Sequence, residues 1–248
     1  MAEAAIRFDR VTRRFGRLAA VQGLTLEIPR GSIYALLGPN GSGKTTIIKM
    51  VVNLLCPSEG RICVLGTDSK SLFAGDFERI GYVSENQEIP EWMTAREYWD
   101  FLRPFYSRWD EVYVEALARQ MDVPLHTAIK RLSRGMRGKV SLISSIAYRP
   151  ELLILDEPFS GLDPLVRDEL VESLLAATRE HRWTIFISSH DIDEVDRFAT
   201  HVGILDEGRL VVGGTKEEVK AQMPEATLKE IFLKHARTFR DAKRNKRL

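Results

Sequence analysis

The sequence predicts an α/β fold with a mainly parallel core sheet. Short apolar runs that fit β-strands alternate with stretches of helical periodicity, which is the order of parallel strands joined by helices. A glycine-rich segment, Gly38 to Gly43, stands between an apolar run and a helical stretch, as in folds that bind phosphate at the end of a strand. We therefore expect ligands to bind at the carboxyl ends of the strands.

The predicted elements follow that alternating order along the chain. Strands are expected at Ile6–Phe8, Leu24–Ile28 and Ile33–Leu37, with a helix from near Gly43 to about Leu54. The stretch Thr94–Gln120 has helical spacing and predicts two helices. After it we expect a strand at Leu152–Leu155, a helix from about Leu165 to Thr178 and a strand at Thr184–Ser188. The chain length predicts one large domain, or one domain with a subdomain.

The composition is that of an ordinary globular protein. Of the 248 residues, 44% are hydrophobic and 29% charged, and the net charge is +1. Neither disorder nor binding to a polyanion is indicated, so we expect no nucleic-acid partner. The two cysteines, Cys56 and Cys63, have no partner at metal-ligand spacing. We expect buried free thiols rather than a zinc site or a disulfide.

Nothing in the sequence predicts a membrane span or a signal peptide. The longest stretch without Asp, Glu, Lys or Arg runs from Gly31 to Gly43 and is rich in glycine, whereas a span needs about 20 apolar residues. Charged residues between Glu3 and Arg10 interrupt any apolar run at the start. We expect the N-terminal residues to be mature cytoplasmic sequence.

A phosphate-binding loop is the strongest motif. The pattern G-x-x-x-x-G-K-[ST] is met by Gly38, Pro39, Asn40, Gly41, Ser42, Gly43, Lys44 and Thr45, and Thr46 follows in the same helix turn. The glycines allow backbone N–H groups to turn toward an anion at the positive end of a helix. Lys44 is expected to reach the outer phosphates and the Thr45 hydroxyl to bind Mg²⁺. This loop alone does not separate kinases, GTPases, recombinases and transport motors.

A second site is predicted where the apolar run Leu152–Leu155 ends in Asp156 and Glu157. Four apolar residues indicate a buried parallel strand that delivers two acids at its carboxyl end. Asp156 is then a candidate Mg²⁺ ligand, and Glu157 is a candidate base that orients or deprotonates an attacking water. Two acids that end a strand are often only solvated turn residues, but the phosphate loop favours the catalytic interpretation.

With these motifs the chain resembles the ATP-binding cassette (ABC) family from about Ile6 to about Gly214. Leu132–Met136 is similar to the family signature Leu-Ser-Gly-Gly-Gln, and Ser160–Asp163 is similar to its D-loop. His190 is similar to the family's switch histidine, and Phe15 stands where the family has an aromatic residue that stacks on adenine. Taken singly, Phe15 is a weak signal, because a lone aromatic near a strand end is a core residue in roughly half of cases. His190 alone would more often be a structural or solvated histidine.

The resemblance implies an ATPase that works as a dimer. Two ATP molecules are expected between two cassettes, with Ser133 and Gly135 of one subunit capping the ATP of the other. His190 is expected to contact the γ-phosphate and Asp163 to link the two sites. We expect ATP and Mg²⁺ as ligands, a homodimer as the default, and separate transmembrane permease subunits, so that the protein would be cytoplasmic and peripheral on the inner face of the cell membrane.

The resemblance also implies a domain plan. An ATPase domain is expected over residues 1–220, with an N-terminal antiparallel β subdomain and a helical subdomain inserted at about 88–148, and a basic helical tail over 221–248. The helical subdomain normally receives the membrane subunits. Its aromatics are accounted for either by a groove for an apolar helix or by simple core packing, and the residues are Trp92, Tyr98, Phe101, Phe105, Tyr106 and Trp109.

Two departures from the family pattern matter. Arg134 and Met136 replace a glycine and a glutamine of the signature, and variants of this form are familiar among bacterial exporter-type cassettes, which points toward export. The loop after Gly81–Val83 has Glu85 where the family often has a glutamine that touches Mg²⁺, with Gln87 two residues on. Glu85 is a candidate metal ligand, and the choice between Glu85 and Gln87 stays open.

The motifs fit three functions to different degrees. An energy-coupling transport ATPase is the leading one. A soluble cassette ATPase of macromolecular assembly, such as iron-sulfur cluster biogenesis, is the alternative, since it too can be one short cassette. A non-catalytic nucleotide-binding module is disfavoured because Lys44, Glu157 and His190 are all present.

Overall fold

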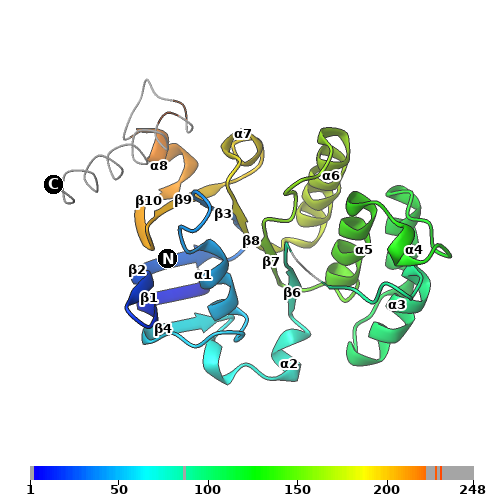
Figure 1. The fold of residues 1–248 in the computed structure, drawn as a ribbon, viewed down its shortest axis with the longest axis horizontal. Helices are drawn as coiled ribbons and strands as arrows, with labels where there is room; N and C mark the ends of the chain where they lie inside the picture. The colour runs from blue at the N-terminus through cyan, green and yellow to red at the C-terminus, as the bar shows by residue number, and fades with distance from the viewer. Residues whose placement is uncertain (1–2, 86–87, 222–226, 228–229, 231–248) are drawn as a thin grey trace. The chain divides into compact units, whose positions relative to one another are not determined.

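The computed structural model describes residues 3–85, 88–221, 227 and 230 (Figure 1). The described chain forms two compact units: one consists of the residues up to Leu72 together with those from Ile185, and the other is Phe73–Thr184.

The first unit contains an antiparallel sheet in the order β2-β1-β4-β5. Its strands are β1 (Ala4–Phe15), β2 (Leu18–Pro29), β4 (Glu59–Val64) and β5 (Thr67–Asp68). The sheet confirms the predicted N-terminal antiparallel layer. β1 and β2 are much longer than the predicted Ile6–Phe8 and Leu24–Ile28, because bulges between Phe8 and Arg14 interrupt the alternation of apolar and polar residues that the prediction relied on.

The same unit contains the parallel strands β9 (His201–Asp206), β3 (Ile33–Leu37) and β8 (Thr184–Ser189), in that order, and β10 (Arg209–Thr215) runs antiparallel to β9. Every residue of β3 and β8 is buried, as expected for strands covered on both faces. Its helices are α1 (Lys44–Val51), η1 (Ser69–Ser71), α7 (Ile192–Val195) and α8 (Lys216–Ala221).

The core between these layers is aromatic and aliphatic. The ring of Phe186 on β8 lies 6.4 Å from Phe8 and 6.2 Å from Tyr34, measured between ring centroids. All three side chains are buried, and such tilted contacts add to the hydrophobic term. Strand β1 is thereby tied to the strand that precedes the phosphate loop.

The second unit has two parallel strands, β6 (Ile80–Val83) and β7 (Leu152–Asp156), paired residue by residue from Ile80 with Leu152 to Val83 with Leu155. Its helices are α2 (Ala74–Phe77), α3 (Ala95–Leu102), η2 (Arg103–Phe105), α4 (Glu111–Gln120), η3 (Ile129–Arg131), α5 (Arg134–Ile146) and α6 (Pro164–His181). The two helices predicted within Thr94–Gln120 are α3 and α4.

Polar side chains at their N-termini explain where these helices begin. Thr94 forms a capping box with Glu97 at the start of α3, and Asp110 accepts the backbone N–H of Tyr113 at the start of α4. Helices α3, α4 and α5 gather together in green in Figure 1. Trp99 on α3 is 1% exposed, and its indole N–H donates to the carbonyl of Val140 on α5 at 3.3 Å.

Some aromatic side chains of the second unit pack in its core, and others are exposed as a groove for an apolar helix would require. Tyr98 is buried, and Tyr106 stacks on Tyr148 at 3.9 Å between centroids, as core packing requires. Trp92, Phe101 and Phe105 are instead 75%, 52% and 65% exposed.

The expectation of buried thiols was wrong, because Cys56 is exposed and Cys63 is only half-buried, although both are free. Within the described part of the chain, no helix is both long enough and apolar enough to cross a bilayer. Nearly all of the predicted tail, 221–248, and Gln87 lie outside the described residues, and the boundaries of the helical subdomain stay a prediction.

Candidate nucleotide-binding site

The phosphate loop joins the end of β3 to the start of α1, as predicted. The Gly38 N–H donates to the carbonyl of Ser189 at 3.3 Å, and a Cβ at Gly38 would lie 2.4 Å from the carbonyl oxygen of Leu205. Gly43 has φ +110°, and a Cβ there would lie 2.6 Å from the carbonyl oxygen of Ala20. Only glycine meets both conditions at position 43, so the loop backbone is held in shape by its neighbours.

Two polar groups inside the loop fit a phosphate. Lys44 is 5% exposed, and its ammonium donates to the carbonyls of Gly38 at 2.6 Å and Pro39 at 3.3 Å. The Ser42 hydroxyl is buried and has no hydrogen-bond partner among the described residues. A buried hydroxyl without a partner normally needs one. An anion at the N-terminus of α1 would accept from both groups.

The remaining loop residues are accessible. Asn40, Gly41 and Thr45 are exposed, and Thr46 is half-buried in the first turn of α1. His190 directly follows β8, and its neighbour Ser189 pairs with Leu37, the last residue before the loop. The structure therefore brings His190 and the phosphate loop to the same edge of the sheet. His190 is exposed and therefore accessible to a ligand.

Phe15 ends β1 and is 45% exposed. The guanidinium of Arg13 covers its ring at 4.6 Å from the ring centroid. The sequence analysis did not select Arg13. The sequence offered no signal for this contact, because the predicted strand ended at Phe8 and register shifts interrupt the alternation of β1 at Arg13.

In the second unit the predicted acids end β7. Asp156 is 2% exposed and Glu157 is 8% exposed. Burial raises the pKa of the Tyr82 phenol, and the negative charge of Asp156 adds to that rise. Glu157 has φ +49°, a left-handed conformation that is rare for a residue with a long side chain. Strain of this kind gathers at functional sites.

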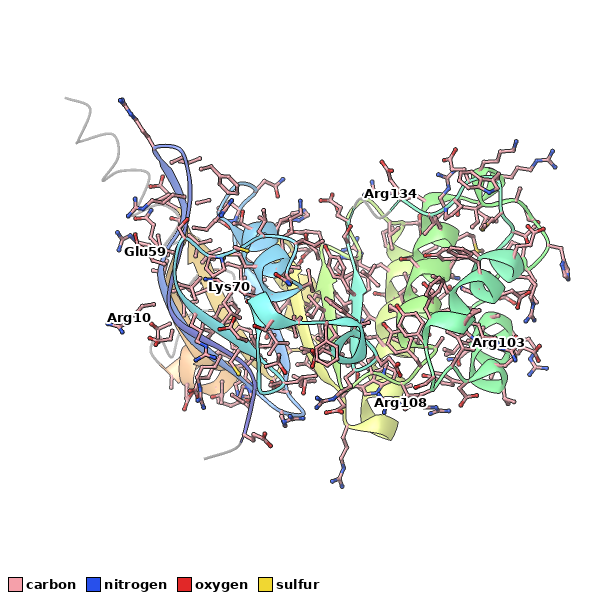
Figure 2. All side chains as sticks on the ribbon, turned by 90° about the horizontal axis from the view of Figure 1, so that it is seen from below. Arg10, Glu59, Lys70, Arg103, Arg108 and Arg134 are labelled. Carbon is pink, nitrogen blue, oxygen red and sulfur yellow. The ribbon has the colours of Figure 1, made fainter. Side chains whose placement is uncertain are left out.

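Glu157 borders a cavity of about 190 Å³, whose wall also contains Glu85, Arg134 and Ser160. The Ser160 hydroxyl donates to the Glu85 carboxylate at 3.1 Å, and an Arg134 nitrogen lies 3.9 Å from the same carboxylate (Figure 2 labels Arg134). The two departures from the family pattern thus meet around one cavity. Sequence reasoning treated Glu85 and Arg134 separately, since 48 residues of intervening chain give no signal of contact.

The turn before α5 is a second helix N-terminus with a serine cap. The Ser133 hydroxyl accepts the Met136 N–H at 3.2 Å and is exposed. A Cβ at Gly135 would lie 2.9 Å from a methyl of Val166, so this helix turn packs closely on α6. Asp163 caps α6 by accepting the Leu165 N–H at 2.9 Å.

Three of the predicted site residues are individual candidates for metal ligands. Among the described residues, no group of three or more His, Cys, Asp or Glu side chains is arranged to hold a metal ion. Thr45, Asp156 and Glu85 each offer an oxygen atom, the donor type that Mg²⁺ prefers. The role of Glu85 as a metal ligand stays a prediction, and its carboxylate already contacts Ser160 and Arg134.

Residues 21–160 match a family model described as "ABC transporter". The chain belongs to the ABC transporter family. Among curated relatives, the Bacitracin transport ATP-binding protein BcrA of Enterococcus faecalis is 33% identical, with 84% of this chain and 68% of that protein covered. The Daunorubicin resistance ATP-binding protein DrrA3 of Streptomyces coeruleorubidus is 32% identical, over 90% of this chain and 72% of the relative.

Further similarities agree with this assignment. The Probable multidrug ABC transporter ATP-binding protein YbhF of Escherichia coli is 30% identical over 93% of this chain, which spans only 41% of YbhF. A solved structure of an ATP-binding subunit of an ABC transporter superposes with a TM-score of 0.84 at 26% identity, covering 93% of this chain and 98% of the other. The predicted family and fold are confirmed: this ABC protein is an ATP-binding transporter subunit that hydrolyses ATP for transport.

Proposed function

We propose that this ABC subunit binds MgATP at the loop Gly38–Thr45 and drives export through separate membrane subunits. The observation that carries the nucleotide site is that the phosphate loop contains both the Lys44 ammonium and a buried Ser42 hydroxyl for which the described part of the chain offers no hydrogen-bond partner. Two loop carbonyls hold the ammonium in place. Exchanging those carbonyls for phosphate oxygens gives stronger, charge-assisted hydrogen bonds.

The residues of the loop and the edge beside it have separate roles. Gly38, Pro39, Asn40, Gly41, Ser42, Gly43, Lys44, Thr45 and Thr46 would hold the triphosphate. His190 would contact the γ-phosphate from the end of β8, and Phe15 would stack on the base. These assignments are supported by the shared sheet edge and by the exposure of Phe15.

The acids of the second unit would serve hydrolysis. Glu157 would orient the attacking water and accept its proton, and burial together with a left-handed backbone gives its carboxylate one restricted position. Asp156 and Thr45 would hold Mg²⁺, with Glu85 as a further candidate. When bound, the ion supplies positive charge that offsets the charge of the phosphates.

We infer that two copies of the chain close around two ATP molecules. The exposed Ser133 hydroxyl and the N-terminal turn of α5 at Gly135 offer a second anion site on the surface of the unit. Asp163 begins α6 beside the Ser160–Gly161 turn and would contact the other subunit. A solved dimeric bacterial ABC transporter cassette, 21% identical with a TM-score of 0.75, supports the fold on which this assembly depends.

The membrane partner would be a separate permease on the inner face of the cell membrane. The exposed side chains Trp92, Phe101 and Phe105 of the second unit provide apolar area for a docking helix. Export is supported by the names of BcrA and DrrA3, which state bacitracin transport and daunorubicin resistance. The signature variant at Arg134 and Met136 also favours export, because it resembles that of bacterial exporter-type cassettes.

Two substitutions test the catalytic assignment. Glu157→Gln should keep ATP binding, reduce phosphate release by at least about 100-fold and accumulate an ATP-bound dimer on size-exclusion chromatography, because only water activation is lost. Lys44→Ala should weaken binding and hydrolysis together. Unimpaired hydrolysis by Glu157→Gln, or unchanged ATP affinity of Lys44→Ala, would overturn the respective role.

The partner is tested by affinity capture. Tagged Glu157→Gln protein with ATP and Mg²⁺, mixed with detergent-solubilised membranes of its native host, should co-purify a multi-span membrane protein. Replacing Trp92, Phe101 and Phe105 by serine should reduce that recovery without changing ATP affinity. Recovery of soluble assembly proteins alone would contradict the permease assignment.

A further inference from the structure

Arg13 and Phe15 form a stacked pair at the end of β1. They are two residues apart in the strand, and a register shift lies between Arg13 and Arg14, so the contact between the side chains and not the alternation of the strand places them together. The guanidinium carbon of Arg13 lies 4.6 Å from the centroid of the Phe15 ring, within the range of a cation–π contact. Phe15 still has 45% of its surface exposed, so the ring is not a core residue that happens to touch an arginine.

The guanidinium is held in place from a second direction. One terminal nitrogen of Arg13 donates to the carbonyl of Cys56 at 2.7 Å. Its Nε is buried and has no hydrogen-bond partner among the described residues. The carbonyl that anchors it belongs to a segment fastened to β1, where Ser58 donates its N–H to the Thr12 carbonyl at 2.8 Å. The guanidinium of Arg13 is therefore held between the Cys56 carbonyl and the Phe15 ring, and its position restricts that of the ring.

This pair lies close to the phosphate loop. Phe15 is opposite Leu18 in the β1–β2 register, and Leu18 is 68% exposed. Two residues further along β2, the carbonyl of Ala20 packs against Gly43, where a Cβ would be 2.6 Å away. At about 3.3 Å per residue, Leu18 and Ala20 are roughly 7 Å apart along the strand, which is within the length of a nucleotide whose phosphates occupy the loop.

We propose that Arg13 is a positioning residue for the nucleotide base, acting through Phe15. The guanidinium fixes the ring as a flat, accessible platform at the correct distance from the phosphate loop. A base that stacks on this platform does not have to order it first, and ordering a free side chain at an interface costs affinity. The inference rests on the proposed nucleotide site and assigns Arg13 to the base-dependent part of the affinity, separate from the phosphate-dependent part.

The test compares two ligands that share the phosphates but differ in the base. The affinities of the full-length chain for ATP and for inorganic tripolyphosphate, each with Mg²⁺, are measured by isothermal titration calorimetry. Arg13→Leu should weaken ATP binding about three- to tenfold, which corresponds to the cost of ordering one free side chain on binding, and should leave tripolyphosphate binding unchanged. In hydrolysis assays the KM for ATP should rise while kcat stays unchanged.

The neighbouring arginine provides the matched control. The side chain of Arg14 is 53% exposed, and its Nε lies 3.6 Å from the Glu59 carboxylate. Within the described chain, it is Arg13 and not Arg14 that covers the Phe15 ring. Arg14→Leu removes the same charge from the same strand and should change neither affinity. Arg13→Lys keeps the charge but not the planar fork, and should fall between wild type and Arg13→Leu.

The outcomes distinguish a failure of the Arg13 role from a failure of the nucleotide site. Equal weakening of ATP and tripolyphosphate by Arg13→Leu, or unchanged ATP binding, overturns the role of Arg13 while the nucleotide site stands. Failure of the wild-type chain to bind either ligand overturns the proposed nucleotide site and this inference with it. If Arg13→Leu melts at a much lower temperature than wild type, the test uses Arg13→Lys instead. The ratio of its ATP affinity to its tripolyphosphate affinity should then be lower than in wild type, and an unchanged ratio overturns the role of Arg13.

Discussion

Replacing Glu85 and Arg134 by glutamine, singly and together, measures whether the two departures from the family pattern are coupled. Glutamine is close in shape to glutamate, and the amide oxygen introduced by Glu85→Gln would still accept the hydrogen bond from Ser160. The double-mutant cycle therefore isolates the charge interaction between the two positions. We expect a favourable coupling at low salt, because one Arg134 nitrogen lies 3.9 Å from the Glu85 carboxylate.

The magnitude follows from that distance and from the exposure of the groups. Unit charges 3.9 Å apart interact with about 1 kcal/mol in bulk water and about 4 kcal/mol at an effective dielectric constant of 20. The Arg134 and Glu85 side chains are 58% and 38% exposed, so solvent screening reduces the coupling to roughly 0.2–1 kcal/mol. In 1 M salt, where the Debye length is about 3 Å, it should fall toward zero.

The assay is urea unfolding of wild type, both single variants and the double variant at 50 mM and 1 M NaCl. Arg108→Gln combined with Glu85→Gln is the control cycle, because Arg108 donates to the Glu78 carbonyl and lies well away from Arg134 (Figure 2). Its coupling should be zero within error. Zero coupling between Glu85 and Arg134 at low salt, or a coupling that salt does not reduce, would refute the reasoning and leave the two departures unrelated.

Three further predictions concern the first unit and the metal. Gly43→Ala should reduce ATP affinity at least tenfold in calorimetry, because φ +110° and the nearby Ala20 carbonyl leave no room for a Cβ; unchanged affinity would contradict the described loop. Tyr34→Phe should raise the free energy of unfolding by about 1 kcal/mol, because the phenol oxygen is buried with no hydrogen-bond partner among the described residues. Burial also raises the pKa of Tyr34. The folded state therefore resists ionisation of this phenol, and the free energy of unfolding of the wild type should fall as the pH rises above the ordinary phenol pKa of about 10. Tyr34→Phe should lose less stability above about pH 10, and an identical alkaline loss would count against this. Chelation of Mg²⁺ with EDTA should abolish phosphate release from ATP, and its restoration by added Mg²⁺ is the control; release that continues without the metal would exclude the proposed metal role.

Local motifs were predictable because their chemistry lies in adjacent residues. The loop Gly38–Thr45 falls between β3 and α1 as expected. The spacing of its glycines and of the lysine predicts both the turn and the helix that follows. Strand β7 was likewise found from four apolar residues that end in acids. The strand bounds of the antiparallel sheet were less predictable. Bulges in β1 break the alternation, and β4 begins with exposed residues that resemble a loop.

The sequence by itself determined the nucleotide-binding motif, the candidate catalytic acids and the family, because each depends on residue types at fixed short separations. Only the tertiary structure decided which distant side chains meet. Arg13 contacts the Cys56 carbonyl across 43 positions, and Ser160 donates to Glu85 across 75. Such contacts depend on register and on the crossing of elements, and no local propensity encodes them. The physical reason is that hydrophobic burial sets the positions of the strands and helices, and their polar partners follow from that arrangement.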